Sequence, residues 1–205
     1  MELDKIIQSR HSIRKYDDKQ IPYEYLTLLL ESARYAPSSG NLQDFRFVVI
    51  DDIDKKNKIA EASLNQYWMN SAPIFIVVCS DSNRLKTYYK NNYEKYSMQN
   101  SAVAAILISL KSVDLGLGSC WVDVFEPNKV AKILGIQDGV VPQIILTIGY
   151  PIYPFTEPQK TLQKISLKRI TFFNKYGDRN IDLGKWGEKK YKEIIKEFLK
   201  KIFKK

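Results

Sequence analysis

A nearly continuous apolar run at residues 73–79 (PIFIVVC) limits the fold of this 205-residue chain more than any other stretch. A strand that exposes one face to water alternates apolar and polar residues, and this run has no polar face. It therefore predicts a central strand that is covered on both faces. With 44% hydrophobic and 27% charged residues, the chain has the composition of a globular protein with one sizeable core.

Helical and strand-like patterns alternate along the rest of the chain. Residues 82–96, rich in Tyr, Asn and Lys, are interpreted as a surface excursion or the start of a helix. Residues 98–113 have the most hydrophobic helical pattern and are expected at the buried centre of the fold. The alternation predicts a layered α/β arrangement. Further strands are expected at residues 45–50, 119–125 (or an extended loop) and 141–149, and further helices around residues 3–7, from Pro22 to before Pro37, at 53–64, and from Pro127 to a C-cap at Gly135.

The net charge of +9 does not indicate a nucleic-acid or membrane protein, because residues 185–205 alone contribute +6 of it. These residues predict an amphipathic helix that packs on its own chain or on a partner subunit. No apolar run approaches the ~20 residues of a membrane span, and the N-terminal residues lack a signal-peptide profile, so a cytoplasmic location is expected. Cys79 and Cys120 lie in apolar runs and are expected to be buried free thiols, with a disulfide as the alternative.

Two short polar stretches are candidates for a binding site. Residues 10–14 (RHSIR) combine two guanidiniums, the only histidine of the chain and a hydroxyl. A guanidinium presents a planar fork of donors that matches phosphate or carboxylate oxygens. Alone, such a cluster is usually a solvated basic turn. Residues 36–43 (APSSGNLQ), dense in small polar residues after an apolar helical pattern, favour a binding role.

The common nucleotide-binding and catalytic motifs are absent from the sequence. Gly116 and Gly118 lack the third glycine of a dinucleotide turn, and there is no Gly-Lys-Ser/Thr phosphate loop. His11 has no Ser or Cys partner in a nucleophile-elbow context. One His and two distant Cys offer no metal-ligand spacing. Without an evident acid, base or nucleophile, the sequence favours a protein whose chemistry belongs to a bound cofactor.

Four motifs in this order resemble the FMN-dependent nitroreductase family: residues 10–14, 36–43, 116–121 (GLGSCW) and 149–151 (GYP). The resemblance covers residues 1 to about 176. It implies an α+β fold, a three-layer α/β/α sandwich around a central mixed sheet of four to five strands, in a single domain over residues 1–205. From about residue 152 onward, an extended segment and a basic helix would be domain-swapped onto the partner subunit of a homodimer.

The resemblance also assigns residues to FMN. Arg10 and Ser12 would bind the phosphate, with His11 alongside. Arg14 would lie near the N1/O2 edge of the flavin, where positive charge stabilises the reduced ring. The remaining expected cofactor contacts are Pro37, Ser38, Ser39 and Asn41, from the other subunit; the amide of Gln66, or of Asn65, at the pyrimidine edge; the backbone N–H groups around Asp123 and Val124 near N5 and O4; Trp121; and Lys160 at the phosphate, with Lys164 in reserve.

Several of these residues could instead have a purely structural role. The loop of residues 36–43 could be a plain helix-terminating turn, Trp121 a core residue, and the lysines surface residues. The chain also departs from the family at two places. Asp123 stands where many relatives have Gly, which would restrict or charge the substrate pocket, and Asp44-Phe45 stands where the family often has Pro-Trp.

The implied activity is that of an FMN-dependent NAD(P)H oxidoreductase. Hydride would pass from NAD(P)H through flavin N5 to a nitroaromatic, quinone or similar electron-poor acceptor in a ping-pong cycle. One alternative is a specialised flavoenzyme of the same family, flavin-fragmenting, dehalogenating or azoline-oxidising. Another is a non-catalytic flavin- or anion-binding regulatory module, for which the basic residues 185–205 would bind nucleic acid.

Overall fold

The computed structural model describes residues 2–153 and 165–178, which fall into two compact units. One unit ends at residue 158 and the other begins at residue 159, so each is described by itself. In the second unit, helix α7 (Leu167–Ile170) precedes a turn in which the rings of Phe172 and Tyr176 pack 4.5 Å apart. Lys160, Lys164 and the basic helix expected within residues 185–205 lie outside the described residues.

The first unit is built on a four-stranded sheet with the order β1-β2-β4-β3. Its strands are β1 (Phe45–Ile50), β2 (Ile74–Asp81), β3 (Gly118–Val122) and β4 (Val140–Gly149). All three strand pairings are antiparallel. The expected mixed sheet is therefore not formed by these strands, and among the described residues the parallel pairing is an isolated bridge between Ser12 and Ser119. Helix–strand alternation left strand direction open, because a connection containing a helix can return the chain to either end of a sheet.

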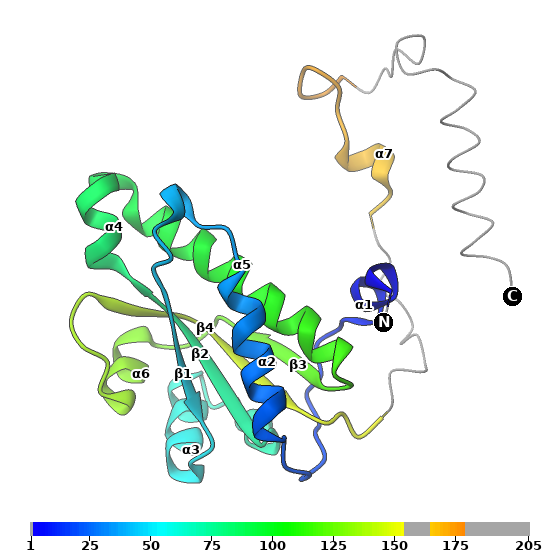
Figure 1. Cartoon of the computed structure of the whole chain (residues 1–205), viewed down its shortest axis with the longest axis vertical. Helices are drawn as coiled ribbons and strands as arrows, with labels where there is room; N and C mark the ends of the chain where they lie inside the picture. The colour runs from blue at the N-terminus through cyan, green and yellow to red at the C-terminus, as the bar shows by residue number, and fades with distance from the viewer. Residues whose placement is uncertain (1, 154–164, 179–205) are drawn as a thin grey trace, which may run out of the picture. The chain divides into compact units, whose positions relative to one another are not determined.

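Helices cover both faces of the sheet (Figure 1), which confirms the three-layer arrangement. Helices α2 (Tyr23–Arg34) and α5 (Tyr93–Asp114) lie on one face, and α3 (Ile53–Ala62) and α6 (Pro127–Leu134) lie on the other. The remaining elements of this unit are α1 (Leu3–Ser9), α4 (Ser82–Tyr89) and the 3-10 turns η1 (Ser39–Asn41), η2 (Tyr67–Ser71) and η3 (Lys90–Asn92).

The apolar run in β2 supplies both cores. Phe75, Val77 and Cys79 pack on the α3/α6 side, and Ile76 and Val78 pack on the α2/α5 side. All five side chains are inaccessible to solvent, as expected for a strand buried on both faces. The prediction of a doubly covered central strand is therefore confirmed.

Helix boundaries differ from the sequence expectations in a few places. Helix α5 is the buried central helix, but it begins at Tyr93 rather than at residue 98. Pro22 is the N-cap of α2 rather than its first residue. Gly135 ends α6 in the left-handed conformation (φ 64°), as expected for a C-cap glycine. No helix within the described ranges is long and apolar enough to cross a membrane.

Candidate functional site

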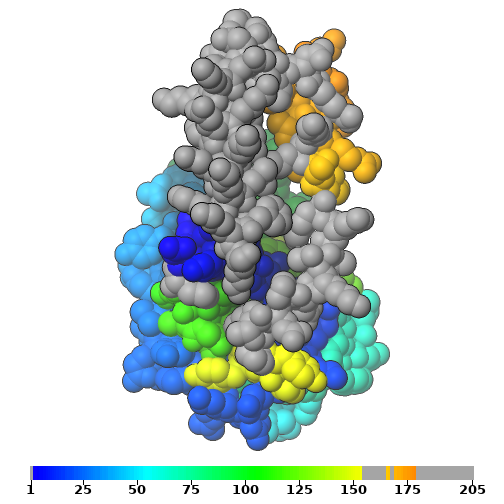
Figure 2. Space-filling model, turned by 90° about the vertical axis from the view of Figure 1, so that its right-hand side faces the viewer, coloured from blue at the N-terminus to red at the C-terminus, as the bar shows by residue number. Residues whose placement is uncertain are grey.

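Residues 10–17 cross the ends of β3 and β4 as an extended segment. The backbone N–H of Ile13 donates to the carbonyl of Ser119 (3.0 Å), and that of Asp17 donates to the carbonyl of Tyr150 (2.8 Å). In Figure 2 the yellow residues at the end of β4 lie against the blue residues that lead into α2. The basic cluster is thus attached to the sheet by its own backbone, which fixes the direction of its side chains.

Two glycines make this crossing possible. Gly118 and Gly149 face each other across β3 and β4. A Cβ on Gly118 would lie 2.7 Å from a side-chain carbon of Ile13, and one on Gly149 would lie 2.7 Å from the ring of Tyr16. Such distances are below contact, so the N-terminal segment reaches the sheet only because both positions lack side chains.

The hydroxyl of Tyr16 anchors the end of the segment. It lies 2.7 Å from the hydroxyl of Thr147 on β4, and it donates to the carbonyl of Ile13 at 2.7 Å. Burial raises the pKa of Tyr16 above its usual range, although the hydrogen bond with Thr147 opposes that shift. The phenol is therefore a neutral structural tie between the segment and the sheet.

Arg10, Ser12 and Arg14 lie near enough to Cys120 of β3 to affect its thiol. Burial raises the pKa of the Cys120 thiol, while the positive charge of Arg14, a hydrogen bond from Ser12 and the charge of Arg10 act in the opposite direction. Neither guanidinium has a carboxylate partner within residues 2–153 and 165–178. Two guanidiniums and a hydroxyl at a strand edge, with no carboxylate partner in the described part of the chain, have the chemistry to bind an anion.

His11 belongs to the same segment but points its ring at the chain itself. Its Nδ1 lies 2.7 Å from the carbonyl oxygen of Ser9, which can only accept, so Nδ1 carries the proton. The hydrogen bond of the imidazole thus stabilises the turn between α1 and the extended segment.

A second group of predicted residues lies beside Arg14. Its guanidinium lies 5.6 Å from the centre of the Trp68 ring, and Trp68 Nε1 donates to Gln66 Oε1 (3.3 Å). Gln66 Nε2 donates in turn to the carbonyl of Val124 (3.2 Å). The structure thus brings Gln66 and Val124 together and connects them to Arg14, although the three residues are far apart in sequence.

The sequence analysis did not identify Trp68, although this residue connects Arg14 to Gln66. A local signal exists beside it: Leu64 and Asn65 have left-handed backbones, with φ of 55° and 59°. Non-glycine residues in this conformation are uncommon and concentrate at functional sites. The amide of Asn65 accepts a hydrogen bond from the hydroxyl of Tyr67 (3.1 Å). Gln66 is therefore the amide that reaches the end of β3.

Three predicted contacts lie in β3 or directly after it. Asp123 and Val124 come directly after the strand and are exposed, Val124 at 54% of its surface. Trp121 is half-buried and packs against the core on the α2/α5 side. Its environment is that of a core residue at the margin of the site.

The loop of residues 36–43 lies at a different end of the first unit. It is bound to the N-terminal half of α5 through Asn100, whose Oδ1 accepts from the backbone N–H and the hydroxyl of Ser39. The segment of residues 10–14 instead lies by the start of β3, just beyond the C-terminal end of α5 at Asp114. Asn100 and Ser112 alone are ~18 Å apart along the helix axis. Pro37, Ser38, Ser39 and Asn41 are therefore not brought to Arg10 and Arg14 within one chain.

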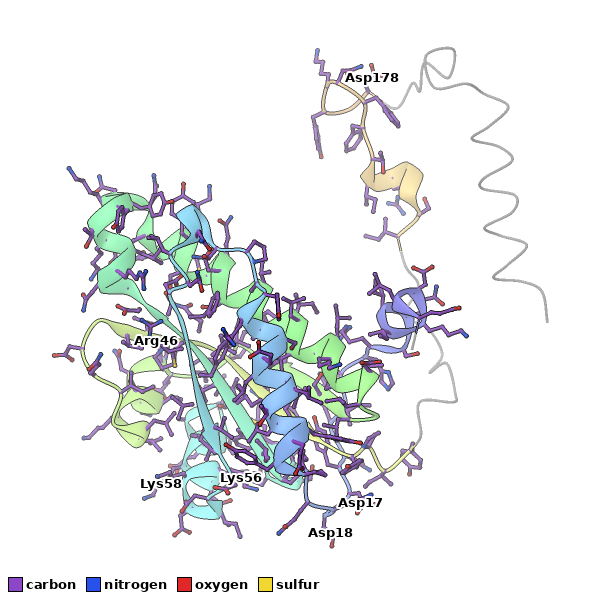
Figure 3. All side chains as sticks on the ribbon, viewed as in Figure 1. Asp17, Asp18, Arg46, Lys56, Lys58 and Asp178 are labelled. Atoms are coloured by element: carbon purple, nitrogen blue, oxygen red, sulfur yellow. The ribbon has the colours of Figure 1, made fainter. Side chains whose placement is uncertain are left out.

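The backbone of this loop is strained. Gly40, Asn41 and Gln43 all have positive φ, at 58°, 53° and 50°. The hydroxyl of Ser38 accepts from the N–H of Gln43 (2.9 Å), and Arg46, labelled on β1 in Figure 3, donates to the carbonyl of Gln43 (3.2 Å). Pro37 and Asn41 are exposed, so the loop presents polar groups outward from a fixed base.

Both cysteines are free and buried, as predicted. Burial raises the pKa of Cys79 to about 12 and also raises that of Cys120.

We expect neither thiol to react with a disulfide reagent in the native protein at pH 8, and both to react in denaturant. Because the folded pKa is the higher one, burial of the Cys79 thiol stabilises the fold below its unfolded pKa, and this contribution is lost as the pH rises toward 12. Fast labelling of either cysteine before unfolding would contradict this expectation.

Comparison with known proteins agrees with this architecture. Residues 7–68 and 61–150 match the Nitroreductase family. The chain belongs to the nitroreductase family. It is 34% identical over 151 residues to a protein of Archaeoglobus fulgidus whose name provisionally assigns it as an NADH dehydrogenase/NAD(P)H nitroreductase, covering 72% of this chain and 84% of the relative. It is 25% identical over 187 residues to the FMN reductase [NAD(P)H] of Bacillus subtilis, covering 84% of this chain and 75% of the relative.

Solved structures show the same fold. A nitroreductase family protein from Clostridium difficile superposes with a TM-score of 0.74 at 26% identity, over 85% of this chain and 99% of that chain. NfrA2 of B. megaterium superposes with a TM-score of 0.76 at 25% identity, over 98% of this chain and 84% of that chain. The nitroreductase fold expected from the four motifs is therefore confirmed.

Proposed function

We propose that this nitroreductase family member is an FMN-dependent NAD(P)H oxidoreductase that reduces nitroaromatic, quinone or similar electron-poor acceptors. The observation that carries the proposal is the pair Arg10 and Arg14 beside β3, which have no carboxylate partner among the described residues, together with the contact of Arg14 with Trp68, which bonds to Gln66. Relatives named as FMN reductase and NADPH nitroreductase support the same assignment.

The residues present fit FMN. Its phosphate is a dianion that suits Arg10 and the hydroxyl of Ser12, and its pyrimidine edge offers acceptors and a donor that suit a guanidinium and an amide. Arg14 and Gln66 supply these groups, and the half-buried indole of Trp68 bridges them. Lys160 and Lys164, the further phosphate ligands expected from the resemblance, lie outside the described residues.

FMN supplies hydride acceptance and donation at N5, and the protein's own residues hold and tune it. Arg10 and Ser12 bind the phosphate. Arg14 places positive charge where reduction adds negative charge, which favours reduction. The backbone N–H groups after β3, at Asp123 and Val124, are proposed to donate toward the N5 edge. No side chain need act as an obligatory general acid, because solvent can provide protons to the open site.

We further propose that the functional unit is a homodimer. The loop with Pro37, Ser38, Ser39 and Asn41 is rigid and polar but lies far from Arg10 of the same chain. A second copy of the chain would bring this loop to the flavin, so that each site is completed by both subunits. NAD(P)H and the acceptor would then occupy the same exposed flavin face in turn.

An anaerobic absorbance spectrum tests this proposal directly. We expect the purified protein, supplied with FMN, to retain a flavin spectrum after gel filtration and to be bleached by NADH or NADPH. Addition of a nitroaromatic or quinone should restore the oxidised spectrum. Protein that does not take up FMN would refute the proposal, and a flavin-loaded protein that neither nicotinamide reduces would indicate a specialised flavoenzyme instead.

A further inference from the structure

Asp44 is a fully buried carboxylate at the base of the loop of residues 36–43. Its Oδ1 accepts a hydrogen bond from Asn100 Nδ2 on α5 (2.6 Å), and its Oδ2 accepts one from the hydroxyl of Ser80 on β2. Its backbone carbonyl accepts from the N–H of Asp81 (2.7 Å). The carboxylate therefore joins the central strand β2 to the central helix α5 by hydrogen bonds.

Asn100 extends this connection to the loop. It is 4% exposed, and its Oδ1 accepts from both the backbone N–H (3.1 Å) and the hydroxyl (3.2 Å) of Ser39. Because a carboxylate only accepts, Asn100 must present its Nδ2 to Asp44 and its Oδ1 to Ser39. The charge of Asp44 thus sets the orientation of the amide, and the amide sets the position of Ser39.

The loop is also held from its other side. Tyr89 at the end of α4 places its hydroxyl over Gly40, where a Cβ would lie 2.6 Å away, and its ring packs on Tyr96 at 4.5 Å. Between these supports the chain adopts left-handed conformations at Asn41 and Gln43. Such strain persists only where the surroundings impose it.

We propose that Asp44 and Asn100 are positioning residues for flavin binding: their hydrogen bonds fix the loop of residues 36–43 in the shape that engages the cofactor. The inference rests on the proposed function, because it requires that this loop contacts FMN. Neither residue touches the cofactor itself. Asp44-Phe45 stands where the family often has Pro-Trp, so the carboxylate at position 44 is a feature of this chain's own sequence.

The test is a swap of the two side chains. In Asn100→Ala, Ser39 loses its acceptor, and we expect faster hydrogen exchange confined to residues 38–43 and about tenfold weaker FMN binding, the size of one ordinary hydrogen bond. Asn100→Asp places two carboxylates face to face and should also weaken FMN binding. Asp44→Asn can still accept from Asn100 and donate to the hydroxyl of Ser80, so its effect should be smaller.

The double variant Asp44→Asn/Asn100→Asp restores every partner. Asn at position 44 can accept from Ser80 and donate to the new carboxylate at position 100, which accepts from Ser39. We expect it to recover the wild-type loop exchange and FMN affinity that Asn100→Asp loses. Because it retains all hydrogen bonds, this variant keeps the proposal testable even if a single variant fails to fold.

Ser97→Ala is the matched control. Ser97 lies about one turn earlier on α5, is equally buried, and accepts a hydrogen bond from Gln143 (2.9 Å) that does not involve the loop. Equal FMN affinity in Asn100→Ala and Ser97→Ala, or a double variant no better than Asn100→Asp, would overturn the inference. Wild-type protein that binds no FMN would instead refute the proposed function, so the two failures are distinguishable.

Discussion

Arg10→Ala is expected to weaken FMN binding roughly tenfold to hundredfold, because a charge-assisted hydrogen bond to a phosphate contributes about 1.5–3 kcal/mol.

Arg14→Ala is expected to act on the flavin reduction potential more than on FMN affinity. The guanidinium of Arg14 lies over the indole of Trp68, beside Gln66. It would therefore face the flavin ring of FMN rather than the FMN phosphate. Its removal should lower the flavin reduction potential while retaining more of the cofactor. Titration of FMN fluorescence and spectroelectrochemistry measure the two effects separately.

Arg34→Ala serves as the control for charge. Arg34 is an exposed arginine on α2 that pairs with Glu31 (2.6 Å) and lies outside the site. It removes the same net charge, so it should change neither FMN affinity nor potential beyond a general field effect. Equal reduction potentials in the wild type and in Arg14→Ala would refute the division of roles between the two arginines.

Gly118→Ala is expected to destabilise the protein by about 2 kcal/mol and to release the N-terminal segment from β3. Its new Cβ would lie 2.7 Å from Ile13, at the point where the backbone of Ile13 bonds to Ser119. Since this bond holds the guanidinium cluster in place, FMN binding should weaken as well. Denaturant unfolding with and without FMN measures both effects.

A double-mutant cycle separates this clash from a loss of strand propensity. Ile13→Ala removes two of the three side-chain atoms that the new Cβ would meet. Combined with Gly118→Ala, it should therefore cost less than the sum of the two single substitutions. Strict additivity would show that Gly118 is not required for the close approach of the N-terminal segment.

The candidate site was predictable in its parts but not in its assembly. The pattern RHSIR marks an anion-binding cluster because guanidiniums and hydroxyls carry that chemistry wherever they lie. Gln66 and Val124 were also indicated through the family resemblance. Their contact with one another, and the Trp68 bridge to Arg14, depend on side chains from separate loops meeting in space. A local sequence pattern cannot predict contacts between side chains of separate loops.

The same division applies to the loop of residues 36–43. Its small polar residues predict an irregular segment, and Gly40 and Asn41 permit its left-handed backbone. Asp44 looked like a departure that weakened the local prediction. Its hydrogen bonds with Asn100 and Ser80 show instead how the base of the loop is fixed. A buried carboxylate can only be interpreted once its donors are known, and both donors lie far along the chain.

The sequence by itself determined the layered arrangement, because an apolar run without a polar face must be covered on both sides. It also determined the family, through the order and spacing of four motifs. Only the tertiary structure decided strand direction, the convergence of Arg14, Trp68 and Gln66, and the separation of the Ser39 loop from Arg10. The physical reason is that residue type and periodicity act locally, whereas these features depend on how distant segments pack against one another.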